Sequence, residues 1–408
     1  MRNCIIAQSG GPTVAINASL AGVLKENENT HYFDNIYGSL NGITGVINDR
    51  LINLSEKVKE SPSFLEKLKV TPAMYLGSCR YKLPDPNEDR AVYESIAKYF
   101  EKKEIDTFFY IGGNDSMDTV YKLSLFFKET GSPVKAIGIP KTIDNDLTCT
   151  DHTPGFGSAA KYIATTVREI CHDTSIYPVK SVTIVEIMGR DAGWLTAAAA
   201  LSRTDYYSLP QHIYLPEVAF SMNAFIEDVK KAMEKSNSVV VAISEGIRDE
   251  KGNYISAGES SEDTFGHSQL SGAGKALEYA VKDALGVKVR SIEINLPQRC
   301  ASHLASLTDL DESMMLGAKA VGLSAEGLTG VMATVNRVSD DPYKAETSYA
   351  DINDIANRVK NVPREWINAE GNDVTEDIVA YLRPLIQGEP KIDFVDGVPE
   401  YLPVVLSE

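Results

Sequence analysis

The chain has 408 residues, and its 57 acidic side chains exceed its 40 basic ones, which gives a formal net charge of −17. Such acidity repels nucleic acids and acidic membrane surfaces at long range, so we expect neither as a partner. The five cysteines have no C-x-x-C spacing to suggest disulfides or a zinc ribbon, and no apolar run suits a signal peptide or a membrane span, so we expect a cytoplasmic protein.

Short apolar runs that lead into glycine-containing or polar loops recur along the chain. In chain order the predicted strands are 4–7, 107–111, 134–139, 182–187, 239–243 and 287–294, with helical patterns at 17–25, after 116 and at 195–201. Continuous apolar strands that alternate with helices are typical of parallel sheets covered on both faces. In such folds ligands bind at the carboxyl ends of the strands, where the polar clusters described below fall.

Three stretches do not fit this alternation. Residues 252–274, rich in glycine and serine, and residues 340–349 are predicted to be loops or insertions. The tail from residue 387 carries three prolines and is predicted to wrap the surface without adding a domain.

Two glycine loops follow predicted strands. Ser9-Gly10-Gly11 leaves backbone N–H groups free near a helix start, which suits a phosphate as well as a simple tight turn. In Gly112-Gly113-Asn114-Asp115-Ser116 the Asn and Asp side chains add the hard oxygen ligands that Mg²⁺ prefers, although Asp115 or Ser116 could merely cap the next helix. Two such loops in one chain indicate a ligand with more than one phosphate.

A third loop, Pro140 to Asp146, holds one cation and two carboxylates directly after a strand. Asp144 could accept a proton from a substrate hydroxyl, and Lys141 could offset charge on a transferring phosphoryl group. A solvated turn with an Asx cap is the alternative interpretation.

Cations and a carboxylate also stand at other strand ends. Arginine forks hold phosphates by two hydrogen bonds, and glutamate accepts hydrogen bonds from sugar hydroxyls. Taken singly, each is more often part of a surface salt bridge, but their shared position favours a site that includes Met188-Gly189-Arg190, Glu245, Arg290 and Arg299. His152 is as compatible with a structural role as with one in the site.

Seven motifs resemble the phosphofructokinase family in sequence and in order. They lie between residues 3 and 320 and read SGGPTVAIN, LGSCRY, YIGGNDSMD, GIPKTIDNDL, TPGFGSAAKY, EIMGRDAGWLTAAAAL and AISEGI. Within the family the chain is similar to the pyrophosphate-dependent branch, because Asp115 and Lys141 stand where ATP-using members usually have glycine. A carboxylate about 4 Å from a nucleotide's α-phosphate would cost about 4 kcal/mol at an effective dielectric of ~20, whereas Lys141 adds a cation for pyrophosphate.

The resemblance implies a fold and an activity. We expect an α/β fold of two doubly wound, Rossmann-like parallel-sheet lobes with the active site in the cleft between them. The implied reaction is the reversible, Mg²⁺-dependent transfer of a phosphoryl group from pyrophosphate to the C1 hydroxyl of fructose 6-phosphate, in glycolysis or gluconeogenesis. The predicted lobes are 1–150 with about 300–350 for pyrophosphate and Mg²⁺, and 151–299 for the sugar phosphate, with 351–408 as an extension packed on them.

The site residues of the family carry over by position. The resemblance implies that Asp144 is the proton acceptor and acts with Lys141 and Asp115, and that Mg²⁺ lies at Asn114. Pyrophosphate would contact Gly11, Arg80, Gly113 and Lys141. The sugar phosphate would contact Thr142, Asp144, Met188, Gly189, Arg190, Glu245, Arg299 and, from a neighbouring subunit, Arg290, so we expect a homodimer or homotetramer.

Some positions depart from the family pattern. Asn114 replaces the usual Asp, and Leu296-Pro297 stands where His or Tyr is common. Ala21 and Lys25 occupy the positions of two arginines that bind a nucleotide effector in bacterial ATP enzymes, so we expect no such control. Two alternatives stay open: an ATP-dependent phosphofructokinase, disfavoured by Asp115 and Lys141, and a catalytically silent regulatory subunit, disfavoured by the presence of Asp144.

Overall fold

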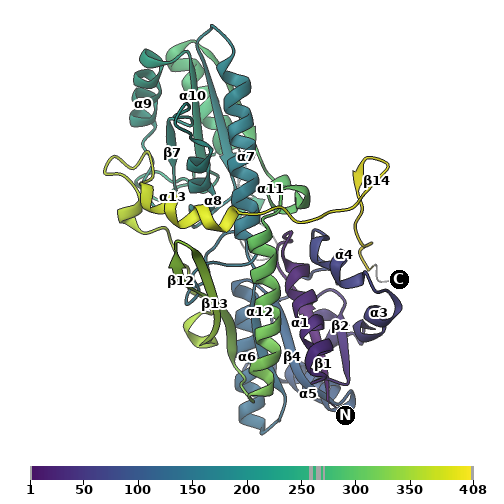
Figure 1. Cartoon of the computed structure of the whole chain (residues 1–408). Helices are drawn as coiled ribbons and strands as arrows, with labels where there is room; N and C mark the ends of the chain where they lie inside the picture. The colour runs from purple at the N-terminus through teal and green to yellow at the C-terminus, as the bar shows by residue number, and fades with distance from the viewer. Residues whose placement is uncertain (1, 257–260, 263–267, 270–271, 406–408) are drawn as a thin grey trace.

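Two main sheets organise the chain in the computed structural model, which describes residues 2–256, 261–262, 268–269 and 272–405. Figure 1 shows the first sheet in the lower half of the molecule, beside helices α1 and α12, and the second sheet in the upper half, beside α7, α9 and α10. Helix α13, near the end of the chain, crosses between the two halves.

The first sheet has seven strands in the order β13-β12-β5-β4-β1-β2-β3. The inner strands run parallel, and the edge strands β3 and β13 run antiparallel to their neighbours. The sheet grows outward from β1 in one direction and from β4 in the other, so a ligand crevice is expected between these two strands. The strands are β1 Asn3–Gln8, β2 Asn35–Ser39, β3 Leu51–Asn53, β4 Ile105–Gly112, β5 Lys135–Pro140, β12 Val331–Asp340 and β13 Tyr343–Asp351.

Helices cover both faces of this sheet, which explains why its central strands are apolar without interruption. In β1, Cys4 and Ile6 pack with residues of α1 and α12, whereas Ile5 and Ala7 pack with residues of α5 and α6 on the opposite face. The helices of this half are α1 Ile16–Thr30, α2 Ile43–Ile47, α3 Leu54–Glu60, α4 Phe64–Val70, α5 Arg90–Lys102, α6 Asn114–Thr130 and α12 Leu307–Ala325.

The second sheet has four parallel strands in the order β11-β6-β8-β7. Helices α7 and α8 cover one face, and α9 and α10 cover the other. The strands are β6 Ser181–Ile187, β7 His212–Tyr214, β8 Ser238–Ser244 and β11 Lys288–Glu293. The helices are α7 Phe156–Ser175, α8 Trp194–Ala197 with a 3₁₀ turn Ala198–Ser202, α9 Met222–Lys235, α10 Ala273–Leu285 and α11 Pro297–Cys300.

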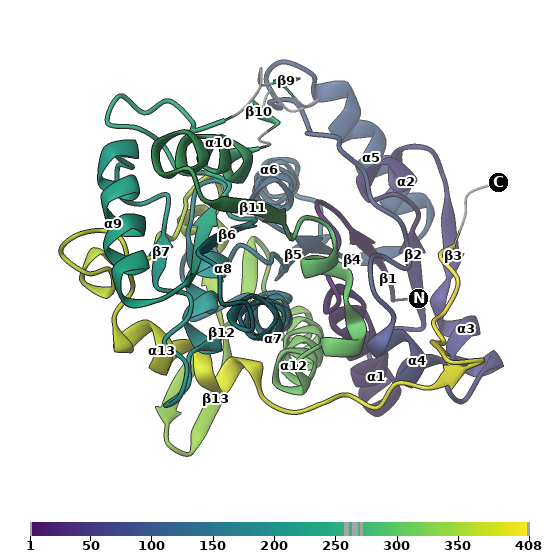
Figure 2. The same ribbon diagram turned by 90° about the horizontal axis from the view of Figure 1, so that it is seen from above.

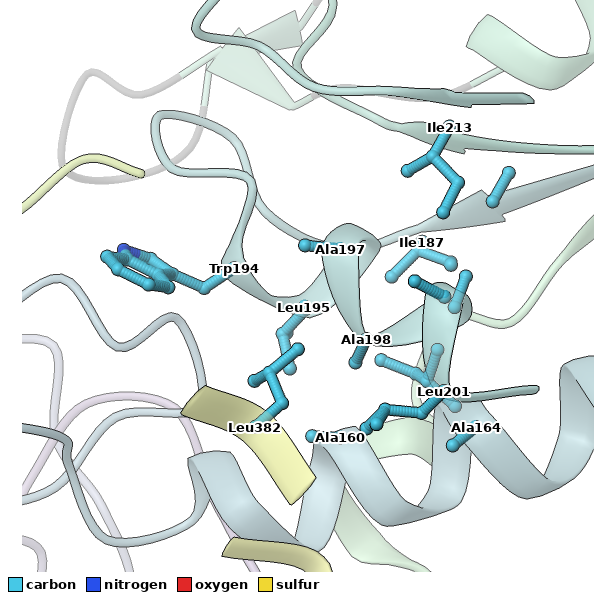
Figure 3. Packing of buried hydrophobic residues seen from close by; sticks show 14 of the residues in the cluster. Ala160, Ala164, Ile187, Trp194, Leu195, Ala197, Ala198, Leu201, Ile213 and Leu382 are labelled. Atoms are coloured by element: carbon cyan, nitrogen blue, oxygen red, sulfur yellow. The ribbon is translucent and has the colours of Figure 1, made fainter. Parts of the chain in front are cut away.

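The C-terminal part of the chain joins both halves of the core. Ile352 and Ile355 pack under the first sheet, and α13 Glu376–Leu382 packs on the second. Figure 3 shows Leu382 of α13 beside Leu195 and Ala160, near Trp194. The tail then carries a 3₁₀ turn Arg383–Ile386 and a small hairpin of β14 Phe394–Val395 and β15 Val398–Pro399.

The predicted α/β class with parallel sheets is confirmed, and so is the course of the tail. The Leu402 N–H donates to Thr71 Oγ1 over 3.0 Å, and the Val405 N–H donates to the Tyr75 carbonyl over 3.2 Å, so the tail runs along the surface of the first half, as Figure 2 also shows. The lobe limits 1–150 with about 300–350, 151–299 and 351–408 stay a prediction.

Three local predictions need correction. Residues 340–349 are not a loop, because β12 and β13 form a long antiparallel hairpin there. The helix expected at 17–25 extends from Ile16 to Thr30, and the one expected at 195–201 is a single α-turn continued as a 3₁₀ turn. The stretch 252–274 lies partly outside the described residues; within it, β9 Ser261–Glu262 pairs with β10 Ser268–Gln269.

None of the helices in the described part of the chain combines the length and the apolar character that a bilayer span requires.

Candidate active site

The loops after β1 and β5 meet at the carboxyl edge of the first sheet. The Lys141 ammonium group donates a hydrogen bond of 2.8 Å to the Gly11 carbonyl. Gly10 has a φ of +83°, and a Cβ at this position would lie 3.1 Å from Lys141 Nζ. Glycine is therefore required at position 10 both by the backbone conformation and by the approach of the lysine.

Lys141 is a buried cation, with only 3% of its surface exposed. Desolvation lowers the pKa of Lys141 to about 8, while the carboxylates of Asp144 and Asp146 oppose this shift. The side chain therefore remains mostly charged at neutral pH. A charge that is already desolvated and fixed stabilises a developing anion without further reorganisation.

The two carboxylates of this loop, Asp144 and Asp146, have raised pKa values. Burial, and next the negative charge of Glu245, raises the pKa of Asp144, whereas Lys141 and Arg190 oppose the rise. Burial and the neighbouring Asp144 likewise raise the pKa of Asp146. A carboxylate whose pKa lies closer to neutrality is a better general base than an ordinary surface Asp.

Hydrogen bonds fix the backbone of this loop. The Asp144 N–H donates to Thr142 Oγ1 over 3.1 Å, and the Thr153 hydroxyl donates to the Thr142 carbonyl over 2.7 Å. Asn145 adopts a left-handed conformation with a φ of +54°, which Asn tolerates better than most residues. Asp144 is thus held on a short loop whose backbone is fixed by hydrogen bonds to Thr142 before it and by the left-handed conformation of Asn145 after it.

Asn114 begins α6 after the second glycine loop, and its side chain is oriented by the distant end of the chain. Its Nδ2 donates a 2.9 Å hydrogen bond to the Arg358 carbonyl. Its Oδ1 is buried and has no hydrogen-bond partner within the part of the chain that the structure describes. An oriented, unpaired oxygen next to a phosphate loop suits Mg²⁺, which uses few protein ligands alongside phosphate oxygens and water.

The neighbours of Asn114 complete this loop. Gly113 is the N-cap of α6 and lies near the Lys141 carbonyl, and Asp115 is exposed in the first turn of the helix. Among the described residues no group of three or more His, Cys, Asp or Glu side chains is arranged to hold a metal ion. The donor set at Asn114 therefore fits a cation that is bound mainly through its phosphate ligand.

The loop after β6 is built for close backbone approach. Gly189 has a φ of +136°, and a Cβ there would lie 2.6 Å from the Ala192 carbonyl oxygen. The Gly189 N–H donates to Glu245 Oε1 and the Met188 N–H donates to Gln298 Oε1, both over 3.3 Å. Side chains that follow β8 and β11 therefore hold the Met188 to Arg190 loop in place.

Arg299, on the short helix α11, links the two halves of the site. A Cβ on Gly11 would lie 3.6 Å from an Arg299 guanidinium nitrogen, so this side chain reaches the first glycine loop. Desolvation lowers the pKa of Arg299, and repulsion by Arg80 adds to this, whereas Asp144 and Glu245 oppose it. The Arg299 guanidinium thus interacts electrostatically both with groups predicted to bind pyrophosphate and with groups predicted to bind the sugar phosphate.

Two arginines of the predicted set differ in their surroundings. Arg190 has a buried Nε without a hydrogen-bond partner in the described residues, as expected of a group that awaits an anionic ligand. Arg290 does not join the other site residues. It lies on the edge strand β11 and lines a small surface pocket with Asp173, Tyr177 and Lys288.

Two groups near the loop Pro140 to Asp146, which we call the acceptor loop, were not expected from the sequence. Lys360 donates hydrogen bonds to Asn145 Oδ1 and to the carbonyls of Thr150 and Asp151, over 3.2, 3.2 and 2.7 Å. Tyr381 accepts a 2.9 Å hydrogen bond from Asn145 Nδ2. Both residues come from beyond position 351, where no motif or strand end marks them, so no local signal could have pointed to them.

The role of His152, which the sequence left open, is structural. Its ring nitrogens lie 2.8 Å from Asp151 Oδ1 and 2.6 Å from Glu312 Oε2. Desolvation would lower the pKa of His152, but the hydrogen bonds to both carboxylates raise it to about 9. His152 is therefore a buried imidazolium that ties α12 to the segment after the acceptor loop.

Comparison with known proteins agrees with this geometry. Residues 3–323 match the family described as Phosphofructokinase, and the chain belongs to that family. It is 40% identical over 401 residues to the pyrophosphate–fructose 6-phosphate 1-phosphotransferase of Halomonas elongata, and 41% identical over 403 residues to that of Xanthomonas campestris pv. campestris, covering 98% of this chain and 95% of each relative.

A solved structure extends the likeness to three dimensions. The pyrophosphate-dependent phosphofructokinase of Marinobacter aquaeolei is 36% identical, with a TM-score of 0.88, and the match covers 100% of this chain and 98% of that one. The architecture of two sheets with helices on their faces is thus shared over the whole length.

Proposed function

We propose that the protein is an enzyme that transfers a phosphoryl group from pyrophosphate to the C1 hydroxyl of fructose 6-phosphate, giving fructose 1,6-bisphosphate and phosphate. The observation that carries this proposal is the buried Lys141 ammonium group, which donates to the Gly11 carbonyl and interacts electrostatically with Asp144. Full-length relatives at about 40% identity whose names state this reaction support it.

The residues divide the chemistry between them. Asp144 accepts the proton of the C1 hydroxyl as that oxygen forms a bond to the transferred phosphorus. The bond between this phosphorus and the bridging oxygen breaks, and inorganic phosphate leaves. Lys141 stabilises the charge on the transferring group, and positioning with electrostatics supplies most of the rate enhancement. Mg²⁺, when held through Asn114 Oδ1, supplies neutralisation of the phosphate charge.

The sugar phosphate is held by the loops of the second sheet. Met188, Gly189 and Arg190 with Glu245 and Arg299 form this part of the site, and Thr142 contacts the acceptor hydroxyl. Arg290, which lies apart from these residues, serves the site of a neighbouring subunit in a homodimer or homotetramer. We place the enzyme in the cytoplasm.

The choice of donor follows from two side chains. Asp115 in the first turn of α6 adds negative charge where the α-phosphate of a nucleotide would lie, and Lys141 adds positive charge for a compact diphosphate. Gly11, Gly113 and Arg80 complete the pyrophosphate site. The exchange of an anhydride for an ester is closer to balanced with pyrophosphate than with ATP, so the reverse reaction is expected to be measurable.

A coupled assay with each donor tests the proposal. With fructose 6-phosphate and Mg²⁺, we expect turnover with pyrophosphate and little with ATP, together with phosphate-dependent cleavage of fructose 1,6-bisphosphate in the reverse direction. Faster turnover with ATP would establish the ATP-dependent alternative. Activity that arises only when a second polypeptide is added would establish the regulatory-subunit alternative.

A further inference from the structure

One short segment of the C-terminal part touches all three groups of residues in the site. Within 357–362, the Arg358 carbonyl accepts from Asn114 Nδ2 over 2.9 Å, and the Lys360 N–H donates to the Asp146 carbonyl over 2.8 Å. The Lys360 carbonyl accepts from Trp194 Nε1 over 2.8 Å, and Trp194 begins α8 four residues after Arg190. Six residues thus join the start of α6 at Asn114, the loop Pro140 to Asp146 and the segment that leads from Arg190 into α8.

A buried carboxylate strengthens the third of these connections. Glu217 Oε1 accepts hydrogen bonds from the Gly193 N–H over 2.8 Å and from the Val362 N–H over 3.0 Å. The segment is therefore bonded both to Trp194 and, through Glu217, to the residue that precedes it.

Lys360 is the centre of this arrangement. Its Nζ lies 5.3 Å from the centre of the Trp194 ring and donates to Asn145 Oδ1 and to the Thr150 and Asp151 carbonyls. Its side chain is only partly exposed, and desolvation lowers the pKa of Lys360 to about 8. A partly buried cation whose three donors all bind residues between 145 and 151 fixes that segment more firmly than a surface lysine could.

Tyr381 of α13 completes the connection from the other side. Its hydroxyl accepts from Asn145 Nδ2 over 2.9 Å and donates to the Asp151 carbonyl over 2.7 Å. Asn145, which adopts a left-handed backbone conformation next to Asp144, therefore has its side-chain oxygen bound by Lys360 and its side-chain nitrogen bound by Tyr381. Both partners belong to the C-terminal part of the chain.

We propose that Lys360 is a positioning residue for phosphoryl transfer, which holds the Thr142 to Asp146 loop against the loop that ends at Trp194 so that Asp144 meets the acceptor hydroxyl. This inference rests on the proposed function. Lys360 donates its hydrogen bonds to protein oxygens and not to a reacting atom, so it acts through Asn145 and the backbone around it. Small displacements of a reacting group, of the order of 1 Å, cost about 10²-fold in rate.

The test is Lys360→Met, which keeps the length of the stem and removes the charge and the donors. We expect kcat to fall about 10²-fold, with the KM values for fructose 6-phosphate and pyrophosphate changed by less than about threefold. Lys360→Arg, which restores a cation and donors, should recover part of the loss. Lys344→Met, which removes an exposed lysine paired with Glu346, is the matched control and should leave kcat unchanged.

A second measurement does not depend on turnover. The chain has only two tryptophans, Trp194 and Trp366. Their rings lie 6.0 Å apart, and both also contact the ring of Tyr381. In Lys360→Met we expect a shifted tryptophan emission and faster amide exchange in 142–151 and 189–194, with exchange in the strands of both sheets unchanged.

Three results would overturn the inference: an unchanged kcat in folded Lys360→Met, a rise in KM without a fall in kcat, or exchange that rises uniformly through the protein. If Lys360→Met does not fold, Tyr381→Phe decides, because it removes one hydroxyl only; kcat should fall at constant KM, and an unchanged kcat would refute the role. A wild-type protein without activity on pyrophosphate would defeat the proposed function instead, and amide exchange would still report on the loops.

Discussion

The loop after β5 buries its lysine almost completely, whereas the loops of the second sheet leave their charges partly open to water. Lys141 is only 3% exposed and sits beside two carboxylates with raised pKa values, Asp144 and Asp146, which are themselves partly exposed. Arg190, Glu245 and Arg299 also keep an intermediate exposure, and none of these three is buried as Lys141 is. Charge that changes during a reaction gains most from a desolvated, fixed partner, but a sugar phosphate carries the same charge throughout. The comparison indicates that the first sheet governs turnover and the second governs binding.

The largest expected effect comes from the proton acceptor. Asp144→Ser should lower kcat by about 10³- to 10⁴-fold, at the upper end of what general base catalysis supplies. The dissociation constant of fructose 6-phosphate, measured by calorimetry, should change little. A variant that keeps its kcat would exclude Asp144 as the base and remove the main distinction between the two sheets.

Lys141→Met should rank second. The loss of a buried cation near the transferring group should lower kcat by about 10²- to 10³-fold, because removal of one preorganised stabilising group typically has this effect. The KM for the sugar should stay nearly constant in steady-state kinetics with both substrates varied. If only the KM for the sugar rises, Lys141 contributes to substrate binding and not to turnover.

Arg190→Met tests the second sheet. A hydrogen bond to a charged group contributes about 1.5–3 kcal/mol, so the KM for fructose 6-phosphate should rise about 10- to 100-fold. The kcat at saturating sugar should fall by much less. If kcat falls as strongly as in Lys141→Met, the two sheets do not divide turnover and binding in the way that their exposure suggests.

The dependence of kcat/KM on pH should also distinguish the residues of the two sheets, although with a smaller effect than the substitutions above. Asp144 must be deprotonated to accept a proton, so activity falls as the pH falls through its raised pKa, above the ordinary carboxylate value of about 4. Lys141 must be protonated, so activity also falls as the pH rises through about 8. Lys360, whose pKa is also lowered to about 8, should contribute to the same limb. The alkaline limb should therefore weaken in Lys141→Met and persist in full in Arg190→Met.

Most of this site could be predicted because each of its loops directly follows an apolar strand. The carboxyl ends of β1, β4 and β5 lie side by side. Gly11, Asn114 and Lys141, which follow these strands, therefore come together, as their positions after the predicted strands indicated. The same reasoning fails for Arg290, because it stands in the middle of an edge strand and not after it.

Lys360 escaped prediction for a different reason. Its importance comes from partners more than 200 residues away, such as Asn145 and Thr150, and no pattern in residues 351–362 reveals them. The hairpin of β12 and β13 was missed because its outer half is polar and only its first half is buried. Burial and long-range pairing, unlike strand-end loops, are set by the assembled fold.

The insertion of β12 beside β5 also determines the order in which the protein can assemble during synthesis. All four strands of the second sheet are available once residue 293 has left the ribosome, but β5 gains its outer neighbour only when Val331 and Met332 arrive to pair with Ile137 and Gly138. Until then the growing polypeptide carries an open strand edge in its earliest part, which is a surface that invites wrong pairing. A nascent chain stalled before position 331 should therefore depend on chaperones far more than the released protein does.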